Sequence, residues 1–439
     1  MLKLTSRITF IKNINTTTTS GLNNNFNIPD NIGKNILSKT DLENLYNAGN
    51  DVAVQFNWVN DIEIDSSFRD LTKKAKITFP RNLNFDGLFL TKNLNSTGKF
   101  IKENRIKLFG RGDRVIIETG YDGNLKEVFR GYIVRVGLDT PLVIDCEDQM
   151  FGLKQMRFSY NSGTGKIALS DLIKKMLTIN NNPWLTASQD VFGFGIPLNT
   201  ESLKDANLIP VFLGLDTVPF SYSTIREKSV AEVLVDLRKK LMIFSFFDDF
   251  GNLNFQLPFM NSNLINTNFL KTFHFEKQIV SEHNMKFQNE NEMSLKIIFG
   301  SARSDKTAKP QTLYANNPGT TDGYVGDSIG DSITINGPED MSQSTLDKYA
   351  LQVLAANKYT GYAKGSSFET FGEPAVYIGE GVKLISTKFP EKSGNYAIVG
   401  IKRNFGINGY RQQIEIGIEL PSQNLSQIIE NQINLNATA

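Results

Sequence analysis

The chain is poor in the residues on which most protein chemistry depends. Its 439 residues include one cysteine, Cys146, and two histidines, His274 and His283. A single cysteine excludes an intramolecular disulfide framework and any zinc site built from several thiolates. Two histidines leave few ligands for a metal ion and few imidazoles for catalysis. We therefore predict no cofactor, no metal site and no enzymatic activity.

An excess of charge of either sign is also absent. Lys and Arg number 47 and Asp and Glu 46, which gives a net charge of +1. This balance argues against a protein that binds nucleic acid through a broad basic face. No apolar run reaches the 18 or so residues of a membrane-spanning helix, and residues 1–10 alternate as a strand does. We therefore expect no membrane-spanning segment and no export signal.

Most of the sequence has the pattern of β-strands. From residue 51 to Cys146, short alternating runs are separated by turns such as Asp122-Gly123, a strong hairpin signal. These runs predict one antiparallel domain, either a barrel or a sandwich. Strands return between residues 273 and 299 and again from residue 375, where Ala375–Tyr377 is predicted as the first strand of this last group.

The last predicted strand is the clearest. Its isoleucines alternate with polar residues, so one face is expected to be buried and the other polar. The polar face is expected to consist of Gln413, Glu415 and Glu419, opposite Ile414, Ile416 and Ile418.

Helical spacing occurs at three places. Ser229 and Glu232 have the spacing of a capping box before an apolar stripe. Another helix is predicted after Ser170, its expected N-cap, and a third over residues 345–359. Gly361 stands near the position of a C′ glycine for the third helix.

Two stretches of the chain share an order of parts. Each begins with a Gly-acidic turn that enters a strand, and the spacing to the next strand is nearly equal. Either any two antiparallel meanders look alike, or the chain holds two copies of one small β-barrel separated by an α/β insertion. The stretches are residues 112–117, 129–134 and 142–145, and residues 379–384, 394–399 and 414–416.

Motifs for catalysis fail on inspection. Residues 161–166 (NSGTGK) are similar to a phosphate-binding loop, but Tyr160 stands where a glycine is required and Ile167 where a Ser or Thr is. The adjacent Asp248 and Asp249 lie in a predicted turn, which accounts for them without catalysis. Cys146 alternates with apolar residues as a small core residue would.

Three segments resemble the phage tail and baseplate hub proteins. This family includes the central hub of contractile-tailed phages, the late control D proteins and the hub part of type VI secretion spikes. Residues 112–149, with the run LVIDCEDQ, resemble its first barrel, residues 229–257 its helix-then-hairpin module, and residues 365–414 its second barrel. The turn and strand signature is carried by Gly112, Asp113, Gly131, Gly379, Gly381 and Gly394.

The resemblance implies a structural protein of the virion, assembled in the host cytoplasm. In such a hub, two tube-like β-barrels per subunit form a pseudo-sixfold ring of three identical subunits between a tail tube protein and a spike or needle protein. Phage DNA passes through the ring, and we expect Gln413, Glu415 and Glu419 to line this channel. Because the chain ends soon after its last strand, the spike is expected to be a separate subunit.

The predicted fold class is mainly β with an α/β insertion, a β-rich α+β protein with two tube-like antiparallel β-barrels and a mixed α/β module. The predicted segments are an N-terminal strand and low-complexity arm (1–50), a first barrel (51–155), an α/β module (156–262) with a long loop (180–222), a second barrel (263–302 and 365–422) interrupted by a loop (303–340) and a helix (345–359), and a C-terminal tail (423–439).

Two other functions stay open at this point. One is a secreted or surface β-rich module that binds glycans through exposed aromatic residues such as Trp58 and Trp184. The other is a peptidoglycan hydrolase delivered by a phage tail.

Overall fold

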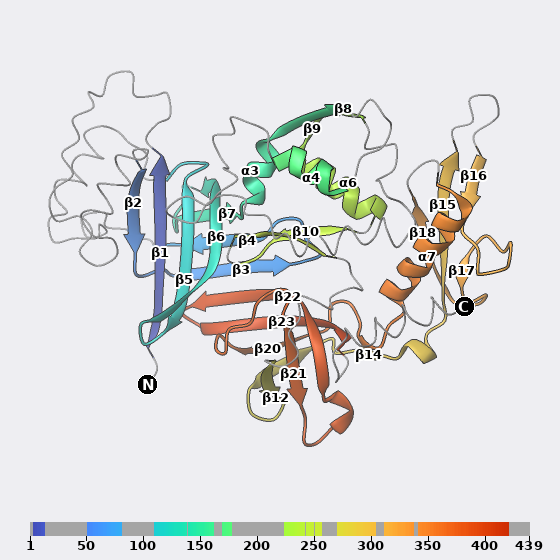
Figure 1. Cartoon of the computed structure of the whole chain (residues 1–439). Helices are drawn as coiled ribbons and strands as arrows, with labels where there is room; N and C mark the ends of the chain where they lie inside the picture. Colours follow the sequence, from blue (N-terminus) through green and yellow to red (C-terminus); the bar gives the residue numbers. More distant parts are fainter. Residues whose placement is uncertain are drawn as a thin grey trace, which may run out of the picture.

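Strands dominate the computed structural model of the chain (Figure 1). The structure describes residues 3–13, 51–80, 109–137, 139–161, 169–177, 224–241, 243–249, 251–256, 270–303, 311–337 and 341–420. The predicted arm up to residue 50, beyond the first strand, the loop at 180–222 and the tail at 423–439 lie outside these residues, as does Trp184.

A 15-stranded sheet draws its strands from both ends of the sequence. The strands of its first half are β1 (Leu4–Asn13), β2 (Asp51–Phe56), β3 (Asp61–Ser67), β4 (Lys74–Thr78), β5 (Arg114–Tyr121), β6 (Asn124–Gly137) and β7 (Val143–Glu147). Those of its second half are β12 (Lys271–His274), β13 (Ile279–His283), β14 (Phe287–Gln288), β19 (Gly361–Tyr362), β20 (Ser367–Phe371), β21 (Gly381–Ile385), β22 (Gly394–Gly406) and β23 (Gly409–Glu419).

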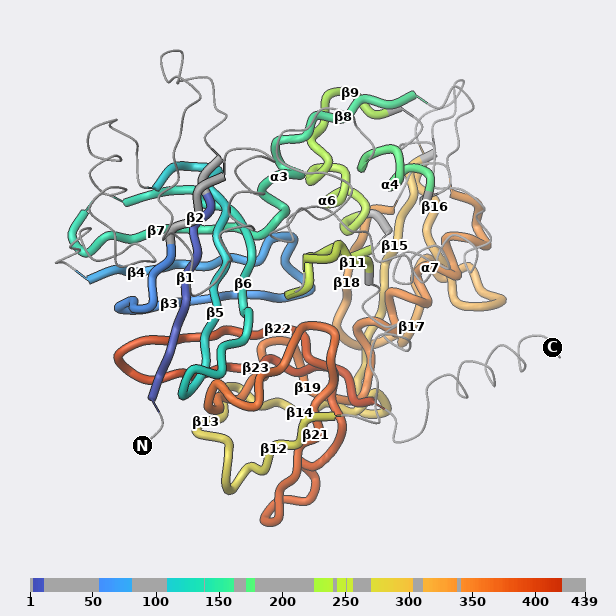
Figure 2. The backbone as a smooth tube through the Cα atoms, turned by 60° about the vertical axis from the view of Figure 1, so that its left-hand side comes forward, coloured from blue at the N-terminus to red at the C-terminus, as the bar shows by residue number. Residues whose placement is uncertain are grey.

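The strand order is β13-β20-β23-β22-β3-β4-β7-β6-β5-β1-β2. In addition, β21 pairs with β22 and β12 with β21, while β19 pairs with β23 and β14 with β19. The predicted hairpin turn at Asp122-Gly123 is confirmed, because both residues have positive φ and Tyr121 pairs with Asn124. Figure 2 shows β1, which begins near the N-terminus, running beside β5 at one side of the molecule, and β2 pairs with its other edge.

The two halves of the sheet join where β22 pairs with β3. Their antiparallel register runs from Gly400–Ser67 to Gly406–Asp61. Because β22 is 13 residues long, it pairs with β21 near its start and still reaches β3 near its end. The expected closed barrels are not seen, since the strand order of the large sheet does not close on itself among the described residues.

The main cores of the two halves lie on the same side of this sheet. Along β22, Ile401, Arg403 and Phe405 point to one side, and all three are buried. Ile401 belongs to a core formed by the second half, and Phe405 to a core formed by the first. Cys146 packs in the first core, as predicted, and burial raises the pKa of its thiol. Arg403 therefore lies at the boundary between two cores.

The middle of the chain forms the expected mixed α/β module. The capping box is confirmed, because the Ser229 amide donates to Glu232 Oε2 (2.5 Å) and the Glu232 amide to Ser229 Oγ (3.1 Å). Ser170 lies inside its helix, so its prediction as N-cap is wrong. The elements are α3 (Met150–Gln155), β8 (Arg157–Asn161), α4 (Leu169–Leu177), β9 (Thr224–Ser229), α6 (Val230–Leu241), β10 (Phe244–Phe247) and β11 (Leu253–Gln256).

A second small sheet shares its core with this module. It corrects two predictions, because the predicted loop at 303–340 contains strands, and residues 295–303 pair with those strands rather than with the large sheet. The predicted helix at 345–359 is confirmed as α7, which packs on this sheet. The elements are β15 (Leu295–Arg303), β16 (Gln311–Tyr314), β17 (Val325–Gly326), β18 (Asp331–Asn336) and α7 (Gln343–Asn357).

Two further predictions differ from the structure. Helix α7 ends at Asn357 with Lys358 as its C-cap, so Gly361 is not its C′ residue and instead opens β19. Residues Ala375–Tyr377 are not a strand. The two histidines lie in separate strands, His274 at the end of β12 and His283 at the end of β13.

We predict that Gly131→Ala destabilises the chain strongly. A methyl group there would lie 2.1 Å from the carbonyl oxygen of Glu147 on the neighbouring strand, and neither backbone can move without breaking the sheet. The expected loss is at least about 2 kcal/mol, measured as a lower urea midpoint.

Gly137→Ala is the matched control, because its methyl group would approach nothing closer than 3.4 Å on the same pair of strands. Equal midpoints for the two variants would contradict this account of Gly131.

Candidate functional site

The side of the large sheet that faces away from the two cores is lined by charged residues. We call this side the charged face. Its members project from seven neighbouring strands, β20, β23, β22, β3, β4, β7 and β6, and are exposed or half-buried. The basic members are Lys74, Lys76, Arg135, Lys402 and Arg411, and the acidic members are Glu63, Asp65, Asp145, Glu147, Glu369 and Glu415.

These residues stand in rows across the strands, because residues opposite one another in register share a side of the sheet. Opposite charges are neighbours within each row. One row is Arg411–Asn404–Glu63–Lys76–Asp145–Arg135, and the next is Glu369–Gln413–Lys402–Asp65–Lys74–Glu147.

Ion pairs connect the rows internally. Arg135 Nε lies 2.7 Å from Asp145 Oδ2, and Lys76 Nζ lies 3.7 Å from Glu63 Oε1. At the join between the two halves, Lys402 Nζ lies 3.7 Å from Asp65 Oδ2. Exposed pairs of this kind add little stability. Their main effect is that lysines and arginines on this face are matched by nearby carboxylates.

The structure places two of the three predicted channel residues on the charged face. Gln413 donates to Ser367 Oγ (2.7 Å), and Glu415 lies 3.2 Å from Arg69 Nη1 and accepts the Gly365 amide (3.0 Å). Register shifts between β22 and β23 then change the alternation. Glu419 pairs with Tyr396, whose ring lies in the second core. The prediction that all three share one face is therefore wrong for Glu419.

The predicted internal repeat is visible in its turns. In the first copy, the Asp113 amide donates to the Gly110 carbonyl (3.1 Å), and in the second copy Glu380 donates to Tyr377 (3.2 Å). The third residue of each turn is a glycine with positive φ, Gly112 at 89° and Gly379 at 87°. This conformation is the one that a type II turn demands, which explains these two signature glycines.

The repeat extends to the register of the strands. Residues Arg114–Ile117 of β5 pair with Tyr132–Phe129 of β6, and the corresponding Gly381–Leu384 pair with Ala397–Gly394. These pairs contain the remaining signature glycines, Gly131, Gly381 and Gly394.

The repeat even includes a β-bulge at the same position. The partner of Ile133 is Cys146 and that of Arg135 is Asp145, so Val134 is the extra residue. In the second copy, Ile398 pairs with Ile416 and Gly400 with Glu415, which leaves Val399 as the extra residue. A generic meander shares strand order but not turn, register and bulge. The two stretches are copies of one structural unit.

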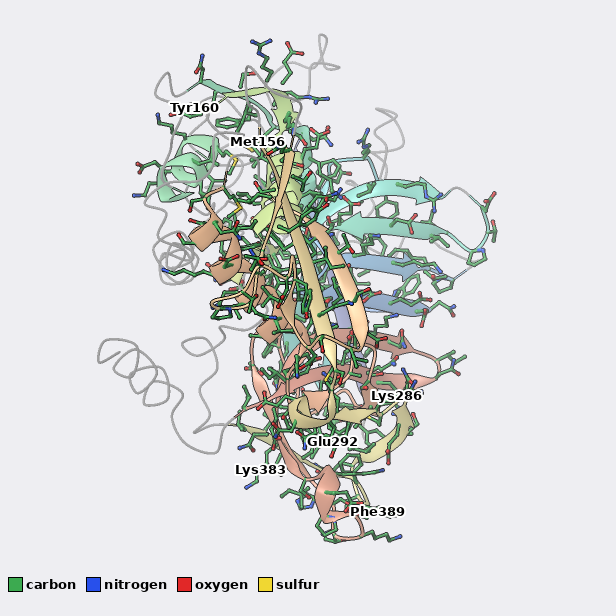
Figure 3. The ribbon with its side chains drawn as sticks, turned by 90° about the vertical axis from the view of Figure 1, so that its right-hand side faces the viewer. Met156, Tyr160, Lys286, Glu292, Lys383 and Phe389 are labelled. Carbon is green, nitrogen blue, oxygen red and sulfur yellow. The ribbon has the colours of Figure 1, made fainter. Side chains whose placement is uncertain are left out.

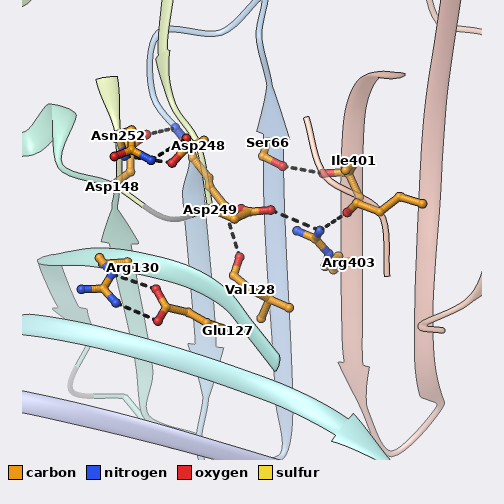
Figure 4. A network of polar contacts seen from close by, with 12 residues as sticks. Ser66, Glu127, Val128, Arg130, Asp148, Asp248, Asp249, Asn252, Ile401 and Arg403 are labelled. Carbon is orange, nitrogen blue, oxygen red and sulfur yellow. Dashed lines mark hydrogen bonds and ion pairs between the residues drawn. The ribbon is translucent and has the colours of Figure 1, made fainter. Parts of the chain in front are cut away.

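A buried polar cluster holds the α/β module against the sheet at the boundary between the two cores (Figure 4). Asp249, in the turn between β10 and β11, contacts the ammonium group of Lys73 and lies 3.4 Å from Arg403 Nη2. Lys73 also donates to the carbonyl of Val128 (2.7 Å), and Arg403 to that of Val376 (2.5 Å). All three charged side chains are almost completely buried.

Burial shifts the pKa values of this cluster. Loss of hydration and the positive charge of Arg403 lower the pKa of Lys73 to about 7. Burial raises the pKa of the neighbouring Asp148 to about 7, although Asp148 accepts the amides of Lys73 and Met150. Arg403 stays charged because a guanidinium does not lose its proton in proteins.

Sequence reasoning missed this cluster. Asp248 does stabilise the predicted turn, since it accepts the amide of Asn252 (2.8 Å), but Asp249 points into the interior. Arg403 stood at an apolar position between Ile401 and Phe405 in an alternating strand. A charged residue at an apolar position of an alternating strand was the sequence signal that could have predicted a buried ion pair here.

The arrangement offers little for catalysis. His283 Nε2 lies 2.9 Å from Ser281 Oγ and 3.9 Å from Glu369, so one nitrogen faces both groups, whereas a catalytic triad uses both ring nitrogens. Among the described residues, no three His, Cys, Asp or Glu side chains gather as ligands of a metal ion would. Nor does any described helix have the length and apolarity to span a membrane. Trp58 is partly exposed beside Phe79.

We predict that Asp249→Asn destabilises the chain by about 3 kcal/mol, because it leaves Arg403 as a buried charge without an acidic partner. Lys73 can lose its proton in response, but Arg403 cannot. The measurement is the free energy of unfolding in urea.

Asp65→Asn is the matched control, since it removes the same group from the exposed pair with Lys402 and should cost less than about 1 kcal/mol. Similar losses in the two variants would show that Asp249 does not hold the module in place.

Comparison with known proteins gives structural similarity alone. No family model matches the sequence, and no curated protein sequence matches it. The chain is similar to the 43 kDa tail protein of prophage MuSo2 from Shewanella oneidensis, with 13% identity, coverage of 83% of this chain and 95% of that one, and a TM-score of 0.49.

Two further solved structures are similar. One is a tail protein from Neisseria meningitidis (12% identity, 83% and 93% coverage, TM-score 0.45). The other is an Escherichia coli component of the type VI secretion system (8% identity, 83% and 74% coverage, TM-score 0.40), which its description likens to bacteriophage T4 tail proteins. The resemblance to phage tail and type VI spike proteins, indicated by the sequence motifs, is thus found again among solved structures.

Proposed function

We propose that the chain is a structural, non-enzymatic subunit of a bacteriophage tail or baseplate. It forms a ring, as a homotrimer, between a tail tube protein and a spike or needle protein. In this proposal it belongs to the virion and is assembled in the host cytoplasm. The observation that carries the proposal is the repeated unit.

If each chain carries two copies of one unit, an assembly of three chains contains six similar units. The copies share turn, register and bulge, and they lie in one sheet with their cores on the same side. Three chains then present a ring of six near-equivalent units, which can meet a sixfold tube on one side and a threefold spike on the other. Each unit corresponds to one of the two tube-like barrels of the proposed ring.

The charged face supports a channel that DNA crosses without binding. Each phosphate contact made by an unpaired lysine or arginine would hold DNA and be released only by salt. Here the basic residues of the face have carboxylates beside them in register. The sequence alone predicted a lining of Gln413, Glu415 and Glu419, whereas the charged face also holds basic residues whose charge the carboxylates balance.

The first test is the oligomeric state of the purified chain. We expect native mass spectrometry to give three times the 49.2 kDa of one chain, and electron microscopy to show a threefold ring with a central opening. An obligate interface of this kind should bury more than about 2,000 Å². A chain that stays monomeric at every concentration would contradict the proposal.

The second test concerns the charged face. The double variant Glu63→Gln, Asp65→Asn removes the partners of Lys76 and Lys402. We expect the assembled variant to retain double-stranded DNA at about 50 mM salt and to lose it at about 200 mM, whereas the unchanged protein retains none. Gel mobility shift or filter binding measures this.

The control double variant is Glu391→Gln, Asp322→Asn, which removes the same net charge from exposed positions off the charged face. DNA retention by both double variants alike would assign the effect to net charge and contradict the channel assignment.

A further inference from the structure

One edge is covered in the first copy of the repeated unit and open in the second. In the first copy, β3 lies beyond β4, and the outer edge of β3 pairs with β22. In the second copy, β13 lies beyond β20 in the same way. Within the described part of the chain, no strand pairs with the outer edge of β13.

The registers show that β3 and β13 are counterparts. In the first copy, Val143 pairs with Thr78, which pairs with Asp61. The corresponding pairs in the second copy join Gln413 to Glu369 and Glu369 to Ser281. Counting residues from the bulge shows that Val143 in the first copy is equivalent to Gln413 in the second. Asp61 is therefore equivalent to Ser281.

The strand that covers β3 also has a counterpart. The covering segment is the part of β22 that follows the bulge at Val399, beginning at Gly400. In the first copy the segment after the bulge at Val134 is the end of β6, residues 135–137. The neighbouring β5 ends its pairing with β6 at Arg114–Tyr132, so no described strand occupies this side of residues 135–137.

We propose that the open edge formed in one chain by β13 and β14 over residues 281–287, two strands joined through the left-handed Asn284, pairs with the end of β6, residues 135–137, of a second copy of the chain. This contact repeats between chains the contact that β3 and β22 make within a chain. Carried over by position, Gly400–Ser67 becomes Arg135–Phe287, and Lys402–Asp65 becomes Gly137–Met285. The inference rests on the proposed ring and assigns its subunit interface.

The surfaces involved are open and partly apolar. Phe287 is 49% exposed, and Val280 on β13 is 50% exposed. An exposed apolar strand edge of this kind is a site where another strand can pair. The Arg135 side chain is 77% exposed. Figure 3 shows Lys286 at the margin of the C-terminal part of the chain, apart from Phe389 at the tip of the β21–β22 hairpin.

The contact joins two different surfaces, so it is head-to-tail and repeats around a ring. It also brings the charged face of one chain, which begins at β20 beside β13, next to β6 and β7 of the following chain. Each chain then contributes the same series of strands to a continuous lining.

The test is a pair of cysteines at the proposed contact, Arg135→Cys with Phe287→Cys. Cys146 does not interfere, because it is buried and its pKa is raised. After mild oxidation we expect covalent trimers on a non-reducing gel, and an equal mixture of the two single variants should give covalent dimers at most.

Two further pairs make the result interpretable. Asp65→Cys with Lys402→Cys spans the existing contact and should form a disulfide within one chain. Arg135→Cys with Ile329→Cys places the second thiol at an exposed position outside the contact and should give no covalent trimer.

The outcomes separate this proposal from the proposed function. A native trimer that forms no 135–287 disulfide, while the 65–402 pair oxidises, would overturn the assigned interface and leave the ring in place. A monomeric chain would overturn both.

Discussion

The carboxylate of Asp249 is the contact on which the arrangement of the molecule depends. It lies between Lys73, which follows β3, and Arg403, which lies on β22, so it is placed where the two halves of the sheet join. Such a cluster gives little net stability compared with apolar packing, because three charges lose their hydration. Its main effect is to fix the position of the α/β module on the sheet. A turn of the α/β module can satisfy both cations at this boundary and would leave them unpaired anywhere else, so the module has one orientation on the sheet.

The sheet has consequently two unlike sides. The side with the cores carries Arg403, which a turn of the α/β module contacts, whereas the opposite side carries rows of alternating charges that continue across the join. A sheet with one buried and one polar side is common in antiparallel proteins. Here the polar side extends over both copies of the repeated unit. The two copies therefore form one continuous charged surface that neither copy forms alone.

The sequence allowed the strands, the capped helix at Ser229 and the repeat to be predicted, because each depends on local spacing or local turn chemistry. It did not predict that the halves join through β22 and β3, since pairing between distant strands leaves no local pattern. The bulges explain a second failure. Val399 and the later register shift on β23 break the two-residue alternation, so Glu419 left the face expected for it. Strands between residues 303 and 340 were missed because their exposed residues are polar and read as a loop.

The pairing of β3 with β22 also has a consequence for synthesis of the chain. Ser66 and Ile401, which meet at this join, are 335 residues apart in the sequence. The edge of β3 therefore stays open while nearly the whole chain is made, and it can be covered from within only after residue 406 has left the ribosome. Two nascent chains on one messenger could exchange their β22 strands during that interval. The β3–β22 pairing within one chain is therefore decided when the last strands of that chain are synthesised. Folding of the first half alone does not decide it.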